Sequence, residues 1–430
     1  MLLKRFIDVE KSEQPAVLWS FAYFFCLLSC YYILRPVRDE MGITAGVANL
    51  QWLFSGTFAV MLAAVPVFGW AASRFPRRRL LPLVYGFFTL NLLIFFGWLT
   101  SGATPAVVAA AFFIWVSVFN LFVVSVFWSF VADLFSTAQA RRLFGFIAAG
   151  GSLGAIAGPL LTAVFAPLVG TANLLLLSAL FLGLAIVCID RLSARAIATS
   201  TGTSTGAALR GSVWSGLRLI AGSRLLMGIC GYILLYTTLS TFLYFEQARI
   251  VQDAIADSAG RTRLFALIDL AVNTLTLIGQ IFVTGRVVTR FGLPLALSLI
   301  PAATVAGFAC LALAPLLAVL VAFQIIRRAG DLIFARPARE MLFTLVNREA
   351  RYKSKNVIDT VVYRGGDAAS GWLVAGLKAM GASTVATAWI ALPIAALWLA
   401  TGWALGRSAE TPISSGDAAR LMNNPTGDET

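Results

Sequence analysis

The sequence predicts an all-helical membrane protein with about twelve transmembrane helices arranged as two similar six-helix halves. Composition is the first reason, because hydrophobic residues make up 59% of the 430 positions and charged residues only 12%, whereas a soluble domain carries roughly 25% charge. The mean hydropathy of +0.85 agrees. The second reason is that apolar runs of about 20 residues, long enough to cross a bilayer, recur along the whole chain.

These apolar runs are continuous and show no alternation of polar and apolar residues, which indicates helices and not the strands of a barrel. The first run is too long and too aromatic for a cleaved signal peptide, so we expect it to remain as the first helix. The predicted centres of the twelve spans are residues 16–34, 49–72, 80–99, 105–131, 143–168, 172–189, 225–245, 264–283, 293–311, 316–334, 357–380 and 384–405.

A polar stretch separates the sixth span from the seventh and divides the chain into two halves. It is rich in Ser, Thr, Gly and Arg, which is typical of a flexible linker. The polar end of the chain has the composition of a disordered tail. We therefore predict a six-helix bundle at residues 1–190, a cytoplasmic linker at 191–224, a second bundle at 225–406 and a cytoplasmic tail at 407–430.

The formal net charge of +13 orients the protein in its membrane. If both termini are cytoplasmic, 24 of the 33 Lys and Arg residues lie in cytoplasmic segments, six lie in outer loops and three lie within helices. This is the positive-inside pattern of a multi-pass protein of a bacterial inner membrane. Basic residues near the membrane, such as Arg141, Arg142 and those at 348–355, are expected to contact lipid headgroups, and no nucleic-acid partner is expected.

The two halves share a glycine pattern at half the chain length. Gly150 and Gly151 in the fifth span lie 215 residues before Gly365 and Gly366 in the eleventh, and a basic segment precedes both pairs. Parallel repeats of this kind are typical of the two halves of major facilitator transporters, so the predicted fold class is major-facilitator-like.

Gly150, Gly154 and Gly158 form a stripe of small residues on the fifth span. Such a stripe either packs statically against a neighbouring helix or forms a surface that slides during gating. A nucleotide-binding glycine loop is a poor interpretation, because the segment is apolar and no Walker lysine follows it.

Ionisable residues within the apolar runs are the candidate binding residues, since each costs about 2.5–3.5 kcal/mol at the centre of a membrane helix. Arg35 and Arg38 follow the first run and share one helical face if the helix continues through Pro36. Alternatively, Arg38, Asp39 and Glu40 pair in a cap at the outer surface.

The eighth span carries Asp269 and Asn273 four residues apart. This spacing places both side chains on one helical face, where they either face a cavity or bond to a neighbouring helix.

The tenth and eleventh spans carry further charges. Arg327 or Arg328 either pairs with Asp331 along its own helix or faces a cavity. In the eleventh span the candidates are Asp359, Tyr363, Arg364 and Asp367. Charges on several helices of both halves indicate a shared polar cavity that attracts anions, because the arginine fork binds phosphate or carboxylate with two hydrogen bonds.

Several other functions are not expected. The chain has no histidine, so a histidine proton relay or metal site is excluded, and its five cysteines lie in apolar runs, where thiols act as small packing groups. We find no metal constellation, no cofactor motif and no catalytic triad, and we predict neither a cofactor nor an enzyme activity.

Three motifs resemble the ATP/ADP translocase family of plastids and intracellular bacteria, a relative of the major facilitators. They are Leu-Arg-Pro-Val-Arg-Asp at 34–39, Phe-Trp-Ser-Phe at 127–130 with Ala-Arg-Arg-Leu-Phe at 140–144, and Pro-Ala-Arg-Glu-Met at 337–341 with Lys353, Lys355 and Ile-Asp-Thr-Val at 358–361. The likeness covers most of residues 15–405. It departs from the family pattern at Asp367, which stands where a lysine is expected, and in the fourth span, which lacks a glutamate.

The resemblance and the intramembrane charges together predict an alternating-access transporter for a small anionic solute, of a phosphorylated or nucleotide-like class. In this interpretation Arg35 and Arg38 hold the anionic group, with Arg327 or Arg364 contributing from the second half. Two alternatives stay open: a major facilitator carrier of a different substrate, such as a lipid, a metabolite or a drug, and a membrane partner or sensor that does not transport. The sequence does not specify the oligomeric state, and a monomer is compatible with it.

Overall fold

A computed structural model describes residues 9–10, 12–74, 77–102, 106–199 and 218–410. Within this part the regular structure is helical, and no strand occurs. The elements are α1 (Gln14–Thr44), η2 (Val47–Asn49), α2 (Leu50–Arg74), α3 (Arg77–Thr100), α4 (Ala106–Leu134), α5 (Thr137–Val169), α6 (Asn173–Thr199), α8 (Arg224–Ala254), α9 (Ser258–Phe282), α10 (Thr284–Leu313), α11 (Leu317–Gly330), η3 (Asp331–Ala335), α12 (Arg336–Leu342), η4 (Phe343–Leu345), α13 (Arg348–Val357), η5 (Ile358–Val362), α14 (Tyr363–Ala379) and α15 (Thr384–Glu410).

Ten of the described helices are long and apolar enough to cross a membrane. The other two predicted spans, 316–334 and 357–380, correspond to compound helices. The first is α11–η3–α12 and the second is α13–η5–α14, and each contains a π-helical segment in its middle. The all-helical polytopic fold that the sequence predicted is therefore confirmed.

Several helices extend beyond the predicted limits. The first ends at Thr44 instead of residue 34, because it continues through Pro36. The sixth continues to Thr199, so the start of the segment predicted as a linker is helical, and the last continues to Glu410, into the segment predicted as a tail. Residues 200–217 of the predicted linker and 411–430 of the predicted tail lie outside the described residues, and residues 218–221 of the linker are helical.

Each half is held together by helix packing within itself. In the first half α1 packs against α4, α5 and α6, and in the second half α8 packs against α14 and α15, while α15 also packs along α10. Large apolar side chains remain exposed on the outside, among them Trp52, Leu83, Leu168, Ile281 and Leu313. This distribution suits a lipid environment, because hydrocarbon replaces water as the solvent of the outer face.

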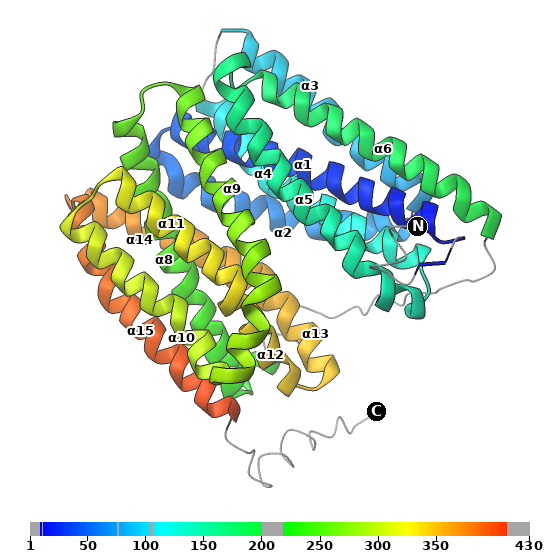
Figure 1. Ribbon diagram of the computed structural model, residues 1–430. Coiled ribbons are helices and arrows are strands. Elements are labelled where there is room, and N and C mark those ends of the chain that lie inside the picture. Colours follow the sequence, from blue (N-terminus) through cyan, green and yellow to red (C-terminus); the bar gives the residue numbers. More distant parts are fainter. Residues whose placement is uncertain (1–8, 11, 75–76, 103–105, 200–217, 411–430) are drawn as a thin grey trace, which may run out of the picture.

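The two most extensive contacts between the halves are related helix pairs, α5 with α9 and α2 with α14, and α1 also contacts α9 and α8. These helices are spans five and eight in the first pair and spans two and eleven in the second. Because span five is equivalent to span eleven, and span two to span eight, the symmetry that exchanges the halves converts one pair into the other. Figure 1 shows the two groups of helices meeting at one end and diverging toward the end where the N-terminus and α13 lie. This arrangement places a shared cavity between the halves.

Candidate functional site

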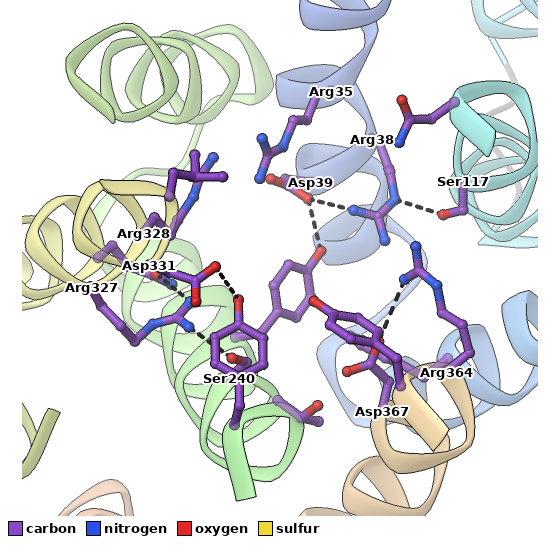
Figure 2. A pocket seen from close by; sticks show the side chains of 18 of the residues that line it. Arg35, Arg38, Asp39, Ser117, Ser240, Arg327, Arg328, Asp331, Arg364 and Asp367 are labelled. Carbon is purple, nitrogen blue, oxygen red and sulfur yellow. Dashed lines mark hydrogen bonds and ion pairs between the residues drawn. The ribbon is translucent and has the colours of Figure 1, made fainter. Parts of the chain in front are cut away.

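A polar cavity of about 520 Å³ lies between the two halves. Its wall comes from α1, α2 and α4 of the first half and from α8, α11, η3, α12, η5 and α14 of the second. Figure 2 shows charged side chains that project toward one another from these elements. Eight of the ten side chains that the sequence predicted for a binding site line this cavity: Arg35, Arg38, Arg327, Asp331, Asp359, Tyr363, Arg364 and Asp367.

The charge of the wall is unbalanced. Seven arginines line it, namely Arg35, Arg38, Arg327, Arg328, Arg336, Arg339 and Arg364, against four aspartates, namely Asp39, Asp331, Asp359 and Asp367. Five tyrosines also line it: Tyr31, Tyr32, Tyr236, Tyr244 and Tyr363. A positively charged and aromatic wall favours an anionic ligand with a planar or apolar portion.

Arg38 is held in the wall of the first half. Its Nε donates to Ser117 Oγ at 3.1 Å and its Nη1 donates to Asp39 Oδ1 at 3.3 Å. The guanidinium carbon lies 3.9 Å from the ring centre of Phe113, a cation–π contact. Because α1 continues through Pro36, Arg35 and Arg38 are both brought to the cavity. These contacts fix the position of Arg38 before any ligand binds.

The outer cap that the sequence left open forms only in part. Arg38 pairs with Asp39 in the cavity wall, and Tyr244 OH from the second half donates to the same Asp39 oxygen at 3.1 Å. Glu40 is instead fully buried against Arg261 of α9, with Nε–Oε2 and Nη2–Oε1 distances of 2.6 and 2.8 Å. The two neighbouring acids of α1 therefore contact different elements of the second half.

Asp269 lies behind the cavity wall and not in it. Its side chain is 1% exposed and pairs with Arg328 of α11 and with Arg35 Nε of α1 at 3.6 Å. Asn273, one turn further along α9, donates from Nδ2 to the backbone oxygen of Ala155 on α5 at 2.7 Å. Of the two placements left open for this pair, bonding to neighbouring helices is the one the structure shows.

Arg327 is held by neutral groups. Its Nη1 donates to Ser240 Oγ at 2.7 Å and its Nη2 donates to Gln324 Oε1 at 3.3 Å. Asp331 accepts a hydrogen bond from Tyr236 OH at 3.4 Å. The pairing of Arg327 or Arg328 with Asp331 along the helix is absent among the ion pairs of the described residues, because Arg328 turns to Asp269.

Arg364 and Asp367 pair along α14, with an Nη1–Oδ2 distance of 3.4 Å. Tyr363 stands beside them, and its ring centre is 6.0 Å from that of Tyr236 on α8. Asp359 in η5 is an exposed residue of the cavity wall. The eleventh span thus contributes one compensated ion pair, one aromatic ring and one further carboxylate.

Sequence reasoning missed Arg336 and Arg339 as cavity residues, because the tenth span was expected to end at residue 334. The compound helix continues to Leu342, and both arginines follow the π-helical segment and line the cavity. The signal that could have identified them is their three-residue spacing, which places both on one side of the helix if the helix continues beyond residue 334.

The end of the molecule that carries the α1–α2, α5–α6 and α8–α9 loops is closed by contacts between the halves. Besides the Glu40–Arg261 pair, Thr171 Oγ1 lies 3.2 Å from Ser258 Oγ and 3.3 Å from Thr262 Oγ1. These polar contacts lie beyond Arg35 and Arg38 along the helices. The cavity therefore does not continue to this end, and it reaches toward α12.

The glycine stripe of α5 packs against α1 within the first half. A Cβ atom at Gly150, Gly154 or Gly158 would overlap a backbone oxygen of α1. The stripe thus lets two backbones approach closely, as small residues do between membrane helices. It does not lie on the α5–α9 contact between the halves, so a gating role remains a proposal.

Comparisons with known proteins agree with this architecture. The sequence profile of the Major Facilitator Superfamily matches residues 16–334. A search among curated proteins finds no match.

Solved structures of similar fold include the nucleoside transporter NupG, with a TM-score of 0.65 and 13% identity over 94% of this chain and 100% of that chain. A POT family transporter in complex with 5-aminolevulinic acid has a TM-score of 0.65 and 12% identity over 92% of this chain and 97% of that chain. A bacterial homologue of the human lysosomal transporter Spinster, inward-facing and unoccupied, has a TM-score of 0.58 and 13% identity over 93% of this chain and 98% of that chain. At these identities the likeness concerns the fold.

Proposed function

The chain belongs to the major facilitator superfamily, and on that premise we propose that it transports an anionic solute by alternating access, with phosphorylated and nucleotide-like compounds as the first class to test. It is a multi-pass integral membrane protein. The observation that carries the proposal is the excess of arginine over aspartate in one cavity shared by both halves.

The charge excess supports an anion as the cargo. Unpaired positive charges in a membrane interior are costly, and a bound anion relieves that cost while accepting hydrogen bonds from several guanidinium groups. Arg38 is already oriented by Ser117 and Phe113, so a ligand there would bind a preorganised donor. An uncharged lipid or drug would leave these donors without charged acceptors.

Contacts between the halves support an alternating cycle. In this state the Glu40–Arg261 pair and the Thr171–Ser258 contact close one end. Access from that end requires these contacts to break while the halves rock around the cavity. The distribution of Lys and Arg supports cytoplasmic termini, so we propose that the closed end faces the outside of a bacterial inner membrane.

Transport can be tested with the purified full-length protein in liposomes. If nucleotides are carried, vesicles loaded with ADP should take up labelled ATP, and empty vesicles should take up much less. If other organic anions are taken up and nucleotides are not, the protein is an anion transporter, but nucleotides are rejected as its substrate class. No uptake from a panel of nucleotides, sugar phosphates and dicarboxylates would reject the proposal and favour a partner or sensor role.

A matched pair of arginine variants tests the cavity itself. Arg38→Gln should lower anion uptake roughly ten- to hundredfold, because a hydrogen bond to a charged group contributes about 1.5–3 kcal/mol. Arg224→Gln removes an exposed arginine at the start of α8 and should leave uptake unchanged. Equal uptake by both variants would exclude Arg38 from the binding site.

A further inference from the structure

The cavity arginines fall into two classes according to their partners. Arg38 pairs with Asp39 and Arg364 pairs with Asp367, and Arg35 and Arg328 share Asp269. These four arginines of the compensated class each have a carboxylate within ion-pair distance. Three carboxylates face these four arginines, so one positive charge remains in this class before any ligand binds.

The second class is Arg327, Arg336 and Arg339, all on the compound helix α11–η3–α12. Among the described residues, no carboxylate lies within 4 Å of their nitrogen atoms, the distance within which the ion pairs occur. Arg327 and Arg339 are 6% and 9% exposed, and the Nε atom of each is buried without a hydrogen-bond partner. Buried guanidinium donors without acceptors, in the wall of a cavity, indicate that a ligand supplies the acceptors.

The π-helical segment η3 brings the buried pair onto one face of its helix. In a regular α-helix, twelve residues would place Arg339 about 120° around the axis from Arg327. A π-helical turn accommodates one extra residue, which reduces this offset to about 20°. Asp331, four residues after Arg327, lies near the same face and within the electrostatic field of all three arginines. The π-helical turn therefore gathers three cations around one carboxylate.

A count of charges indicates how many negative charges the ligand carries. Seven arginines line the cavity, and five aspartates compensate them when Asp269 is included with the four of the wall. The remaining ion pairs close by, Lys355 with Glu340 and Lys378 with Glu246, are neutral in themselves. With every carboxylate ionised, two positive charges remain. A monoanion would leave one of them uncompensated, whereas a dianion neutralises both.

We propose that Arg327, Arg336 and Arg339 form a subsite for a doubly charged oxyanion, either a phosphomonoester or a dicarboxylate, and that this second-half subsite determines specificity. The proposal rests on the proposed function and refines it, because it moves the main anion contact from the compensated Arg35 and Arg38 to the second half. Asp331 and Asp359, which also lie near these arginines, repel a ligand of higher negative charge and so favour two charges over three or four.

Charge-matched probes test this subsite by isothermal titration calorimetry of the full-length protein in detergent. Phenyl phosphate carries nearly two negative charges at about pH 7.5, because its second ionisation lies near pH 6, and phenyl sulfate has the same shape with one charge. Phthalate and benzoate form the corresponding carboxylate pair. The wild-type protein should bind at least one of the dianions more tightly than the matching monoanion, by about tenfold or more. The dianion that binds more tightly then shows whether the ligand is a phosphomonoester or a dicarboxylate.

Two variants and a control test which arginines produce the preference for a dianion over a monoanion. Arg327→Gln and Arg339→Gln should weaken dianion binding about tenfold and change monoanion binding much less, so that the ratio of affinities approaches one. Arg224→Gln, in the exposed first turn of α8, should keep the wild-type ratio. Circular dichroism and the apparent melting temperature show whether each variant is folded.

The outcomes separate this subsite from transport itself. Equal wild-type affinity for dianion and monoanion, or no binding of any of the four probes, overturns the subsite, while uptake in the vesicle assay decides on anion transport separately. Loss of the dianion preference in Arg38→Gln but not in Arg327→Gln or Arg339→Gln overturns the assignment to the second half.

Discussion

Asp269 receives an arginine from each half of the molecule, Arg35 from α1 and Arg328 from α11. The carboxylate is 1% exposed, and the two guanidinium groups retain partial exposure through the cavity. A carboxylate buried among apolar helices is tolerated when cations and hydrogen bonds surround it. The side chain therefore joins α1, α9 and α11 in one electrostatic unit at the edge of the cavity.

Asp269→Asn should destabilise the protein more than any isosteric change at an exposed aspartate. The amide has the same size but no charge, so Arg35 and Arg328 lose their common carboxylate. The expected loss is about 3 kcal/mol of unfolding free energy, at the lower end of the range for buried pairs because both arginines contact the cavity. The measurement is the unfolding midpoint in detergent, followed by tryptophan fluorescence.

Asp253→Asn is the matched control, because Asp253 is exposed at the end of α8. Its effect should stay within about 0.5 kcal/mol. If the two variants unfold at the same midpoint, the ion pairs of Asp269 do not contribute to stability.

At the scale of elements, the two compound helices differ from the other ten spans. Each contains one π-helical segment, η3 with Asp331 and η5 with Asp359, and both aspartates line the cavity. π-helical turns inside α-helices occur frequently at functional sites, because the extra residue changes which side chains face inward. In η3 this change aligns Arg339 with Arg327.

Inserting one alanine after Leu332 tests the register that η3 sets. The additional residue turns Arg336 and Arg339 by about 100° relative to Arg327. We expect dianion binding to fall to the level of the monoanion, while the helical content measured by circular dichroism stays that of the wild type. Leu332→Ala keeps the register and should retain the dianion preference, so equal binding by the insertion variant and by Leu332→Ala would contradict the register argument.

The sequence allowed most of the helices to be predicted, because a span needs about 20 apolar residues and the linker between halves is polar. It also allowed Arg35, Arg38, Arg327 and Arg364 to be placed at a cavity, since a charge within an apolar run is costly anywhere else. These inferences depend on local composition and helical spacing alone.

The remaining features depend on packing between helices that are distant in sequence. Asn273 faces Ala155 of α5 because of how α9 crosses the other half, and no spacing within α9 indicates that neighbour. Arg336 and Arg339 became cavity residues through the π-helical turn and the continuation of the tenth span. Neither feature has a compositional signal, since both arginines lie in a polar segment that is typical of a membrane boundary.

At the scale of the whole molecule, the structure is closed at one end and holds its cavity toward the other. The closing contacts come from the α1–α9 and α5–α9 regions, at the ends of long helices. A rocking motion of the halves separates such contacts farthest, because they lie far from the cavity. Whether these contacts are formed or broken therefore indicates from which side of the membrane the cavity is accessible.

A disulfide across the closed end should stop transport. In the double variant Thr171→Cys, Ser258→Cys, the hydroxyl groups that lie 3.2 Å apart are replaced by thiols, a separation compatible with disulfide geometry after small adjustments. Mild oxidation should form the bond and abolish uptake, and a reducing agent should restore it. Full uptake by the oxidised and cross-linked protein would show that the closed end does not open during the cycle, and each single variant controls for oxidation elsewhere.

Among the described residues that line the cavity, every cation is an arginine and none is a lysine. A guanidinium group does not lose its proton in proteins, unlike an amine. Alkaline medium will therefore not remove the charge of the cations in this wall. Acetylating reagents that act on amines will find no target on the wall, whereas dicarbonyl reagents, which form adducts with guanidinium groups, will inactivate it unless the cargo is already bound.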